Sequence, residues 1–369
     1  MVCQFFGHPV CVDVAVNDVL KLCSLVGVNI ARIEKKMTEE RSANSQVSVD
    51  MTTTGLTGGN TMTSSSSRDA EFYFQCAVLI IGVVGTATNA LILYALVASK
   101  QHKKHVLIFN QNALDLFSSF FMVVSYSLML CNIRLTGSVG YWLCTLLFSE
   151  SLVWCGAVGS DISLASITIE RYLKVVHPVW SKNKLRRWMI YLAMAFSWIG
   201  SFVYNAASVV PTTAVVDGTC YAYAFFKNET DPIIHVIYSF ISFYLIILLI
   251  FVYCYWRILI VIRRQARVMA GHNATAASSA QNISNKIRSN VIKTVILVSA
   301  FYAILWLPYY VYILYLSLNP HIISFDACYY ALTCIAYMYT CANPFIYATK
   351  FSPVKQVLLR LICVKNTSE

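Results

Sequence analysis

Seven long apolar runs constrain this chain more than any other feature, since each is close to the roughly 20 residues that a helix needs to cross a bilayer. They lie at about residues 73–98, 106–130, 142–169, 188–210, 233–256, 291–317 and 326–349. Of the 369 residues, 58% are hydrophobic and only 12% are charged, about half the charge of an ordinary soluble domain. The pattern excludes a disordered chain and argues against a soluble enzyme. It predicts an all-α membrane protein, a seven-transmembrane helix bundle.

Acidic and amide side chains inside two of these runs indicate that the bundle has a polar interior. They are Asn110, Gln111, Asn112 and Asp115 in the second run and Glu150 and Asp161 in the third. Such groups are costly in hydrocarbon, so they must face protein or water. The runs are therefore expected to pack together rather than to act as isolated anchors.

Basic residues in the loops predict the orientation, because short cytoplasmic loops accumulate Lys and Arg. They follow the odd-numbered runs: Lys100, Lys103, Lys104; Lys174, Lys182, Lys184, Arg186, Arg187; Arg257, Arg263, Arg264, Arg267, Lys286, Arg288, Lys293; and Lys350, Lys355, Arg360, Lys365. The alternate loops hold only Arg134 and Lys227. We expect a multi-pass plasma-membrane protein with an extracellular N-terminus. This topology accounts for the net charge of +11 without a nucleic-acid partner, and it makes membrane lipids partners of the basic faces.

The chain is expected to divide into three regions. Residues 1–72 are an extracellular flexible tail, residues 73–349 the bundle, and residues 350–369 an amphipathic helix and a short cytoplasmic tail. No cleaved signal peptide is predicted, and Met37 and Met51 are alternative starts. Asn228 begins a glycosylation sequon in an outer loop. Cys363, just after the amphipathic segment, is either a palmitoylation site or a free thiol.

Several motifs occur in order along the runs. Glu170-Arg171-Tyr172 ends the third, Trp306 and Pro308 lie in the sixth, and Asn343-Pro344-Phe345-Ile346-Tyr347 ends the seventh. Further positions are Asn89, the segment 110–116, Trp198 and Tyr255. Arg171 alone could simply snorkel to the headgroups. Together the motifs resemble those of rhodopsin-like G-protein-coupled receptors, of the peptide-type or orphan invertebrate branch.

The resemblance implies a receptor that transduces an extracellular ligand into heterotrimeric G-protein activation, with arrestin and a receptor kinase as further partners. It is not an enzyme, and no catalytic constellation is present. The implied coupling and activation residues are Glu170, Arg171, Tyr172, Tyr255, Trp306, Pro308, Asn343, Pro344 and Tyr347. Glu170 would hold Arg171 at rest, Arg171 and Tyr255 would meet on activation, and the two prolines would bend their helices.

The resemblance also implies an allosteric sodium ion at Asp115, Ser160, Thr340 and Asn343, with no other cofactor. The alternative is a protonated Asp115 hydrogen-bonded among Asn89 and Asn343. A disulfide between Cys144 and Cys220 is implied, with Cys131 as a competing partner. The spacing from Cys144 to Arg171 is about two residues longer than is usual for the family, which predicts a bulge in the outer part of the third span.

The sequence departs from the family pattern beneath the ligand pocket. Ile247 replaces a proline, Asp161 a hydrophobic residue and Tyr302 a phenylalanine. We expect Asp161 either to hydrogen-bond Tyr302 or to join the network of Asp115. Arg288 stands at the inner end of span six in place of an acid, which predicts raised basal activity.

The predicted ligand pocket is aromatic. Trp306, Tyr309, Tyr310 and Ile313 share one helix face at positions i, i+3, i+4 and i+7, and Tyr337, Val153 and Glu150 are expected to join them. The position that pairs amines is Val153 or Ser151, which leaves Glu150, one turn above Val153, to pair an ammonium or a basic peptide side chain. No lysine stands at the level of Tyr337, which excludes a retinal Schiff base.

A peptide ligand is the favoured prediction, and a non-peptide small molecule is the alternative. A transporter is the rival class, since transporters also use intramembrane carboxylates and broken helices. Ligand-dependent nucleotide exchange on a G protein would distinguish the receptor from saturable solute flux.

Overall fold

The computed structural model describes the backbone of residues 61–131, 133–223, 226, 230–271, 279–318, 327–350 and 352–365. Within these helices the side chains of residues 61–68, 265–292, 349–353 and 361–365 are not described. The chain divides into two compact units, Met1–Glu71 and Phe72–Glu369, and the description below concerns the second. The sites predicted at Asn228 and Cys363 and the side chain of Arg288 lie outside the described residues.

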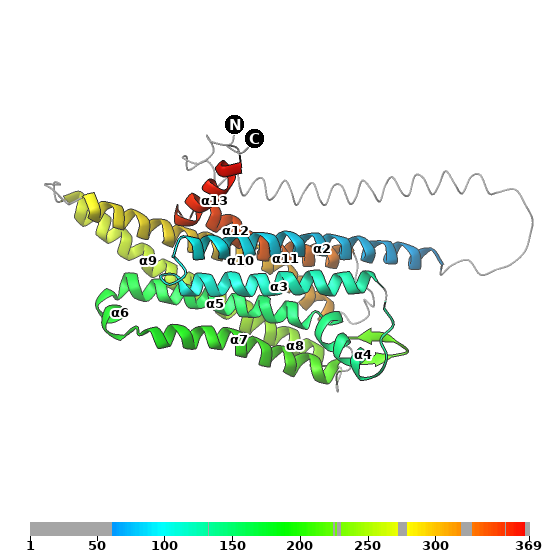
Figure 1. Cartoon of the computed structure of the whole chain (residues 1–369). Coiled ribbons are helices and arrows are strands. Elements are labelled where there is room, and N and C mark those ends of the chain that lie inside the picture. The colour runs from blue at the N-terminus through cyan, green and yellow to red at the C-terminus, as the bar shows by residue number, and fades with distance from the viewer. Residues whose placement is uncertain are drawn as a thin grey trace, which may run out of the picture. The chain divides into compact units, whose positions relative to one another are not determined.

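The described chain forms a bundle of long antiparallel helices (Figure 1). The main helices are α2 (Thr61–Ala98), α3 (Val106–Leu130), α5 (Ser151–Val176), α7 (Arg187–Val209), α8 (Asp231–Ser239), α9 (Ile246–Gly271), α10 (Ser279–Leu318), α11 (Ala327–Tyr337) and α12 (Tyr339–Lys350). Six helical stretches of the described chain are long and apolar enough to cross a membrane. The seventh expected span is present but divided at Met338 into α11 and α12, each shorter than a full crossing. The predicted seven-helix bundle is confirmed.

Shorter elements connect the spans. They are α4 (Gly137–Leu143), η1 (Cys144–Phe148), α6 (Pro178–Lys184), η2 (Val210–Thr212), β1 (Ala214–Val216), β2 (Thr219–Tyr221), η3 (Phe240–Leu245) and α13 (Ser352–Lys365). Helix α13 contains the predicted amphipathic segment: Val354 is fully buried, whereas Leu359 and Arg360 are exposed. Helix α2 begins at Thr61, ahead of the expected start at residue 73.

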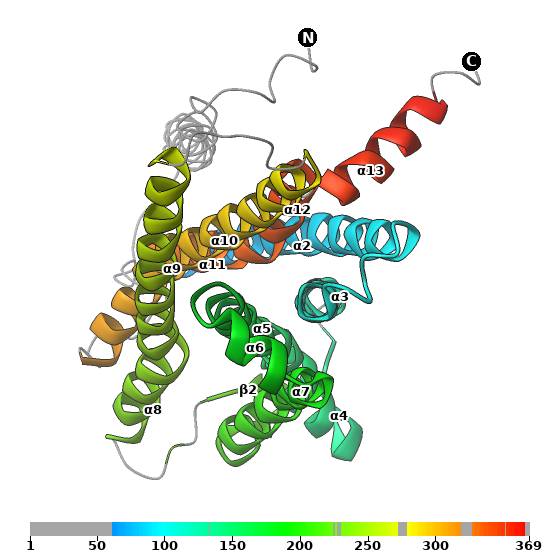
Figure 2. The same cartoon turned by 90° about the vertical axis from the view of Figure 1, so that its left-hand side faces the viewer.

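Helix α5 occupies the middle of the bundle, where it packs on α3, α7, α9 and α10 (Figure 2). Its contact with α3 is close because Gly156 has no side chain. A Cβ atom at Gly156 would lie 2.6 Å from Cβ of Ser118 and 2.8 Å from its backbone nitrogen. The small residue therefore sets the spacing of the two helices.

Asn110 joins three helices through its amide. Its Nδ2 donates to the hydroxyls of Ser163 in α5 and Ser197 in α7, each at 3.1 Å, and its Oδ1 accepts from Nε1 of Trp198 at 2.9 Å. Both N–H groups and the oxygen of the amide are thus hydrogen-bonded, and Asn110 itself is only 2% exposed. A satisfied polar network of this kind specifies one packing arrangement.

The third span is interrupted near its start, as the long spacing from Cys144 to Arg171 predicts. The π-helix η1 begins at Cys144, and Glu150 then adopts a left-handed backbone conformation with φ 57°. Each π-turn takes in one extra residue relative to an α-helix. The bulge is confirmed, and it aims Glu150 away from the regular helix face.

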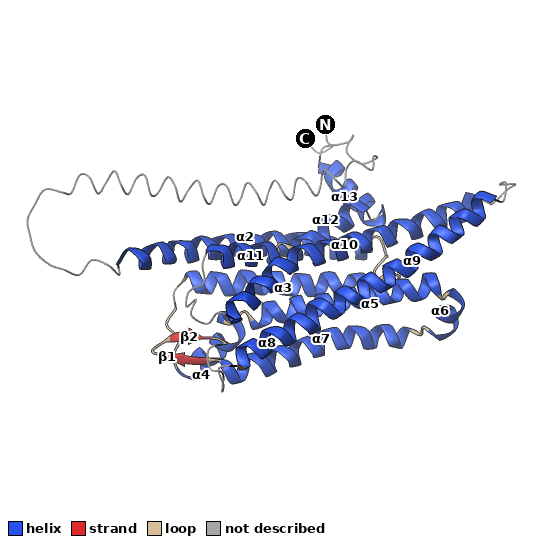
Figure 3. Cartoon of the chain, turned by 180° about the vertical axis from the view of Figure 1, so that it is seen from behind, coloured by secondary structure: helices blue, strands red, loops and turns tan. Residues whose placement is uncertain are grey.

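A second π-helix, η3, lies between α8 and α9 in the fifth span, and Figure 3 shows α8 and α9 following one another along this span. It comes just before Ile247, where the family carries a proline. A π-turn, like a proline, frees a backbone carbonyl from its helical partner. Here the freed group is used: the carbonyl of Phe243 accepts a hydrogen bond from the hydroxyl of Tyr302 in α10.

A β-hairpin caps one end of the bundle, hereafter the hairpin end. Strands β1 and β2 pair with Val215 opposite Cys220, and Asp217 and Gly218 both take positive φ in the turn, as a two-residue hairpin requires. A disulfide joins Cys220 to Cys144, the pair that the resemblance implies, whereas Cys131 is a free, exposed thiol. The hairpin is thereby fixed over the start of the third span. The opposite end, where α5 reaches α6, is called the Arg171 end (Figure 1).

Candidate functional site

The Arg171 end holds a small cluster of charged side chains. Arg171 Nη2 lies 3.7 Å from Oε2 of Glu170, and Lys174 contacts the other oxygen of the same carboxylate. The predicted resting partner of Arg171 is therefore in place. Only 14% of the Arg171 side chain is exposed. Its guanidinium is therefore stabilised mainly by these few protein groups rather than by water.

His105, at the start of α3, is a partner of Arg171 that the sequence reasoning missed. Its Nδ1 lies 3.1 Å from Arg171 Nη2. Burial, reinforced by the guanidinium, lowers the pKa of His105 to about 4. The imidazole is thus neutral near pH 7 and its Nδ1 accepts the hydrogen bond from Arg171. No sequence signal pointed to it, because a histidine in a loop has no helical pattern to place it.

Two of the three tyrosines predicted for activation, Tyr255 and Tyr347, have different hydrogen-bond partners. The hydroxyl of Tyr255 lies 2.9 Å from that of Thr168 and 2.8 Å from that of Ser299, so it bridges α5, α9 and α10. Tyr347 donates to Oε1 of Gln111 at 3.1 Å. Neither hydroxyl contacts Arg171, so the predicted meeting of Arg171 and Tyr255 on activation stays a prediction.

Tyr172 points outward beside the same cluster, where its hydroxyl lies 3.2 Å from Nε2 of His177. Pro308 and Pro344 lie inside α10 and α12, both of which continue through them. Each proline removes one backbone donor from its helix. The break in the seventh span falls instead at Met338, six residues before Pro344.

The middle of the bundle contains a buried polar site centred on Asp115. Asn343 Nδ2 donates to Oδ2 of Asp115 at 2.7 Å, and Ser160 lies beside the same carboxylate. Asp115, Ser160 and Asn343 are fully buried. Oδ1 of Asp115, the Ser160 hydroxyl and Oδ1 of Asn343 make no hydrogen bond within normal distance to the described residues. Three unpartnered oxygens, one of them from the carboxylate itself, are a donor set that suits a hard cation.

Thr340, the fourth predicted member, contributes differently. Its hydroxyl donates to the carbonyl of Tyr337 at 2.8 Å, and its own carbonyl accepts from Nδ2 of Asn89 at 3.0 Å. Thr340 therefore braces the seventh span beside the site. Within the described residues no group of three or more His, Cys, Asp or Glu side chains could hold a metal ion, so oxygen ligands from neutral groups are what the site offers.

The expected hydrogen bond between Asp161 and Tyr302 is wrong. Tyr302 donates to the carbonyl of Phe243 instead, because η3 leaves that carbonyl free and within reach. Asp161 is 4% exposed, and its Oδ1 has no hydrogen-bond partner in the described part of the chain. It lies within electrostatic range of Asp115, so the alternative, that Asp161 joins the Asp115 network, stays a prediction.

At the hairpin end, Glu150 is held by two tyrosines. Tyr126 in α3 donates to one carboxylate oxygen and Tyr337 in α11 to the other. The ion pairs found in the described residues involve Glu170 and leave Glu150 without a basic partner. The carboxylate is thus oriented by neutral donors and has no counter-charge from a described side chain.

An aromatic cluster lies directly below Glu150. Trp154 occupies its middle, with ring centroids 5.8 Å from Trp306, 5.9 Å from Tyr309 and 5.8 Å from Tyr337. Tyr310 packs on Trp306 at 6.0 Å. Trp154 was not predicted, since the displacement of the helix by η1 could not be converted into a side-chain direction.

The remaining predicted pocket residues lie around this cluster. Val153 is fully buried in a core group with Tyr337, and Ile313 is half-buried one turn beyond Tyr309. Grooves of about 630 Å³ and 370 Å³ in the described chain lie elsewhere, and neither is lined by Glu150 or Trp306. Apart from Ile313, the predicted pocket residues are therefore in contact with one another through Tyr337, Trp154 and Trp306.

This arrangement defines a class of protein. Seven apolar helices enclose a buried carboxylate site, an aromatic cluster lies at one end, and a shielded arginine lies at the other. The fold and these sites are those of a multi-pass helical membrane receptor.

Comparison with known proteins identifies the family. The family described as 7 transmembrane receptor (rhodopsin family) matches residues 88–347, and the chain belongs to it. An allatostatin-A receptor of Bombyx mori is 25% identical over 318 residues, covering 80% of each chain. The melanin-concentrating hormone receptor 1 of Rattus norvegicus is 26% identical, covering 73% of this chain and 74% of that receptor. A melanopsin of Podarcis siculus is 24% identical over 63% of this chain and 49% of its own.

Proposed function

We propose that this rhodopsin-family receptor detects an extracellular peptide at the hairpin end and activates a heterotrimeric G protein at the Arg171 end. The observation that carries the proposal is the pairing of an uncompensated carboxylate, Glu150, with an aromatic cluster that leads down to Trp306. Relatives named for allatostatin-A and melanin-concentrating hormone, both peptide ligands, support it. The protein would lie in the plasma membrane with its N-terminus outside.

The chemistry at Glu150 suits a cationic group of the ligand. The Glu150 carboxylate is oriented by two tyrosine hydroxyls and lies next to Trp and Tyr rings. It therefore offers a cation both charge pairing and cation–π contact. A lysine or arginine side chain, or a free amino terminus, fits that description. The ligand would enter between Tyr126 and Tyr337, which now close over the carboxylate.

Binding there can reach the Arg171 end through α10. Trp306 contacts Trp154, and Tyr302, one helical turn nearer the Arg171 end of α10, is hydrogen-bonded to η3. A ligand that displaces Trp154 would therefore change the packing of the helix whose far end closes over Tyr255. Release of Arg171 from Glu170 and His105 would then expose a cation for the G protein.

A sodium ion at Asp115 is the second part of the proposal. Two buried carboxylates, Asp115 and Asp161, lie near one another, and no arginine or lysine of the described residues is an electrostatic partner of either. Such a pair must take up protons or a cation. Asp115, Ser160 and Asn343 would hold the ion, which would supply the missing positive charge and stabilise the resting packing.

The test of the main proposal is a screen of peptides in cells that express the receptor, read out as nucleotide exchange on several G-protein subtypes. Active peptides should contain a basic group, and replacing that group by a neutral one should lower potency. Glu150→Gln should lower potency by about 10-fold to 100-fold, since a charge-assisted contact contributes roughly 1.5–3 kcal/mol. The Glu150→Gln receptor should respond equally to the basic peptide and to its neutral analogue.

Asp217→Asn is the matched control, because Asp217 is an exposed acid at the hairpin turn and Asn also tolerates its positive φ. It should leave potency unchanged. Saturable solute flux without nucleotide exchange would overturn the receptor proposal, and equal effects of the two substitutions would overturn the role of Glu150.

A further inference from the structure

Two side-chain hydrogen bonds join α12 to α3 in the interior of the bundle. Nδ2 of Asn343 donates to Oδ2 of Asp115 at 2.7 Å. The hydroxyl of Tyr347 donates to Oε1 of Gln111 at 3.1 Å. The bonded residues are four apart in each helix, so each pair shares one helix face, and all four are at most 1% exposed. We call the first bond the outer rung and the second, which is nearer the Arg171 end, the inner rung.

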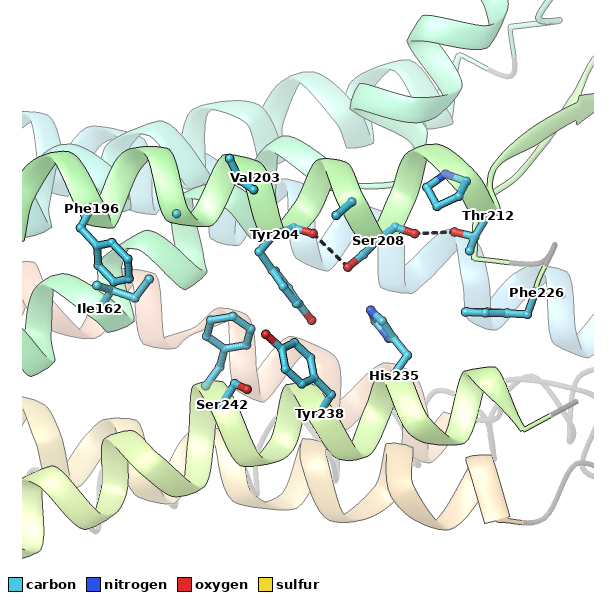
Figure 4. Close-up of a pocket in the computed structure, with 14 residues that line it drawn as sticks. Ile162, Phe196, Val203, Tyr204, Ser208, Thr212, Phe226, His235, Tyr238 and Ser242 are labelled. Atoms are coloured by element: carbon cyan, nitrogen blue, oxygen red, sulfur yellow. Dashed lines mark hydrogen bonds between the residues drawn. The ribbon is translucent and has the colours of Figure 1, made fainter. Parts of the chain in front are cut away.

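The amide of Gln111 is only partly satisfied in the inner rung. Its Oε1 accepts from Tyr347, whereas its Nε2 has no hydrogen-bond partner among the described residues. Neither of the two grooves mentioned above is lined by Gln111, and the larger one lies between α7 and α8 (Figure 4). A buried donor left unpaired costs free energy. That cost offsets part of what the bond to Tyr347 contributes, so the inner rung is a weak contact that can open.

Helix α12 is weakened between the two rungs. Pro344 has no backbone N–H to donate to the carbonyl of Thr340, and this carbonyl accepts instead from Nδ2 of Asn89 in α2 at 3.0 Å. The contact with Asn89 and the outer rung hold the part of α12 before Pro344. Beyond the proline, Tyr347 ties the helix to α3 through the inner rung. The inner rung can therefore open while the outer rung stays closed.

Tyr347 lies next to the groups that are predicted to couple to the G protein. It is within electrostatic range of Arg171 and Tyr255, and its ring belongs to the same hydrophobic core as that of Tyr255. A tyrosine hydroxyl has one hydrogen to donate, and here it is donated to Gln111. Tyr347 must therefore leave Gln111 before it can donate to a group at the Arg171 end.

We propose that Gln111 is a positioning residue that holds Tyr347 in the resting arrangement, and that opening of the inner rung is a step of activation. The proposal rests on the proposed activation of a G protein at the Arg171 end, although the rung itself can be measured without a G protein. One neutral hydrogen bond changes an equilibrium constant about fivefold. Loss of the inner rung therefore shifts the receptor toward its active arrangement by about that factor.

The first experiment compares basal nucleotide exchange at equal surface expression. Gln111→Met keeps an unbranched side chain but removes the acceptor, and should raise basal exchange about fivefold. A merely structural defect would lower exchange instead. Gln111→Glu retains an oxygen that can accept from Tyr347 and should keep the basal rate of wild type. Equal basal rates for Gln111→Met and wild type would overturn the proposal.

Asn112→Leu is the matched control for this experiment. Asn112 is fully buried on α3 like Gln111, but its amide donates to the carbonyl of Ile108 in its own helix at 2.8 Å. The substitution should leave basal exchange unchanged. A rise equal to that of Gln111→Met would show that any lost amide in α3 has this effect, which would overturn the role of the inner rung.

The second experiment is thermal unfolding in detergent without a G protein. Gln111→Met and Tyr347→Phe each leave a buried partner unpaired, so the double variant should be more stable than the sum of the two losses predicts. Asn112→Leu and Tyr347→Phe should instead give additive losses. Additive losses for Gln111→Met and Tyr347→Phe would overturn the inner rung. This result does not depend on signalling, so a receptor without nucleotide exchange would contradict the proposed function and the cycle would still decide whether the rung exists.

Discussion

Tyr302 donates its hydroxyl hydrogen to the backbone carbonyl of Phe243, and this bond links the sixth span to the π-helix of the fifth. A second bond runs the opposite way, from the hydroxyl of Tyr244 to the carbonyl of Ala303 at 2.9 Å. Each tyrosine is the chain neighbour of the residue that the other one binds. The reciprocal pair fixes η3 against α10 where the family's proline connector is missing.

We expect Tyr302→Phe and Tyr244→Phe each to loosen this junction. Loss of one buried hydrogen bond should lower the free energy of unfolding by about 1 kcal/mol and leave a carbonyl unsatisfied. Basal nucleotide exchange should rise, because the resting junction is weakened. The double variant should be less destabilised than the sum of the singles, since the two bonds share one interface. Tyr94→Phe, at an exposed position of α2, should change neither property.

The contact of His105 with Arg171 predicts a second effect on basal activity. His105→Leu removes the acceptor at 3.1 Å from the guanidinium, so Arg171 is freed from one of its two restraints. Basal nucleotide exchange should rise several-fold, as a hydrogen bond to a charged group contributes roughly 1.5–3 kcal/mol. His105→Asn, whose amide oxygen can accept in place of Nδ1, should restore the low basal level. Equal basal rates in the Leu and Asn variants would show that the contact has no role.

The same histidine gives the receptor a pH dependence. Its pKa is lowered from 6.5 to about 4 in the folded protein, so the folded state binds fewer protons than the unfolded state between these values. The stability from the neutral imidazole is full above pH 6.5 and is lost as the pH falls through about 4. The thermal midpoint of wild type should therefore fall relative to that of His105→Leu across this window. Midpoints that stay a constant distance apart would contradict the assignment.

Much of this architecture could be predicted from the sequence, and the failures have a common cause. Hydropathy located the spans, and the count from Cys144 to Arg171 signalled the bulge at η1. The second π-helix, η3, has no such signal in the sequence, because no two motif residues of known spacing lie on either side of Phe240–Leu245. A π-turn that the sequence does not mark changes the direction of the side chains before it. Counting residues along the fifth span therefore does not identify the partner of Tyr302.

The candidate sites show the same limit. The resemblance to the rhodopsin-like family predicts that Asp115 and Asn343 lie together, and they do, because both lie on regular helix where the spacing of the family's motifs carries over. Trp154 lies one turn after Glu150, whose backbone is left-handed, and His105 lies just before the first residue of α3. For both residues the side-chain direction depends on local backbone geometry that a periodic pattern does not contain.

Asp115→Asn tests the proposed sodium site. The substitution keeps the size of the side chain but removes the charge that would hold the ion. Wild type should bind agonist more weakly in sodium chloride than in an equal concentration of choline chloride, since the ion stabilises the resting packing. Asp115→Asn should bind equally in both salts. A wild-type receptor that shows no difference between the two cations would contradict the ion and leave a protonated Asp115 as the explanation.

Gly156→Ala and Gly200→Ala form a matched pair that tests the packing of α5. At Gly156 the new methyl would lie 2.6 Å from Cβ of Ser118 and 2.8 Å from its backbone nitrogen, and neither atom can move without shifting α3. At Gly200 the nearest atom is 3.6 Å away, on the ring of Phe196. Alanine also favours a helix over glycine by up to about 1 kcal/mol. Gly200→Ala should thus be neutral or slightly stabilising, whereas Gly156→Ala should lose about 1–3 kcal/mol through overpacking. Thermal midpoints in detergent that rank the two variants in the reverse order would show that α3 and α5 are not in the close contact described.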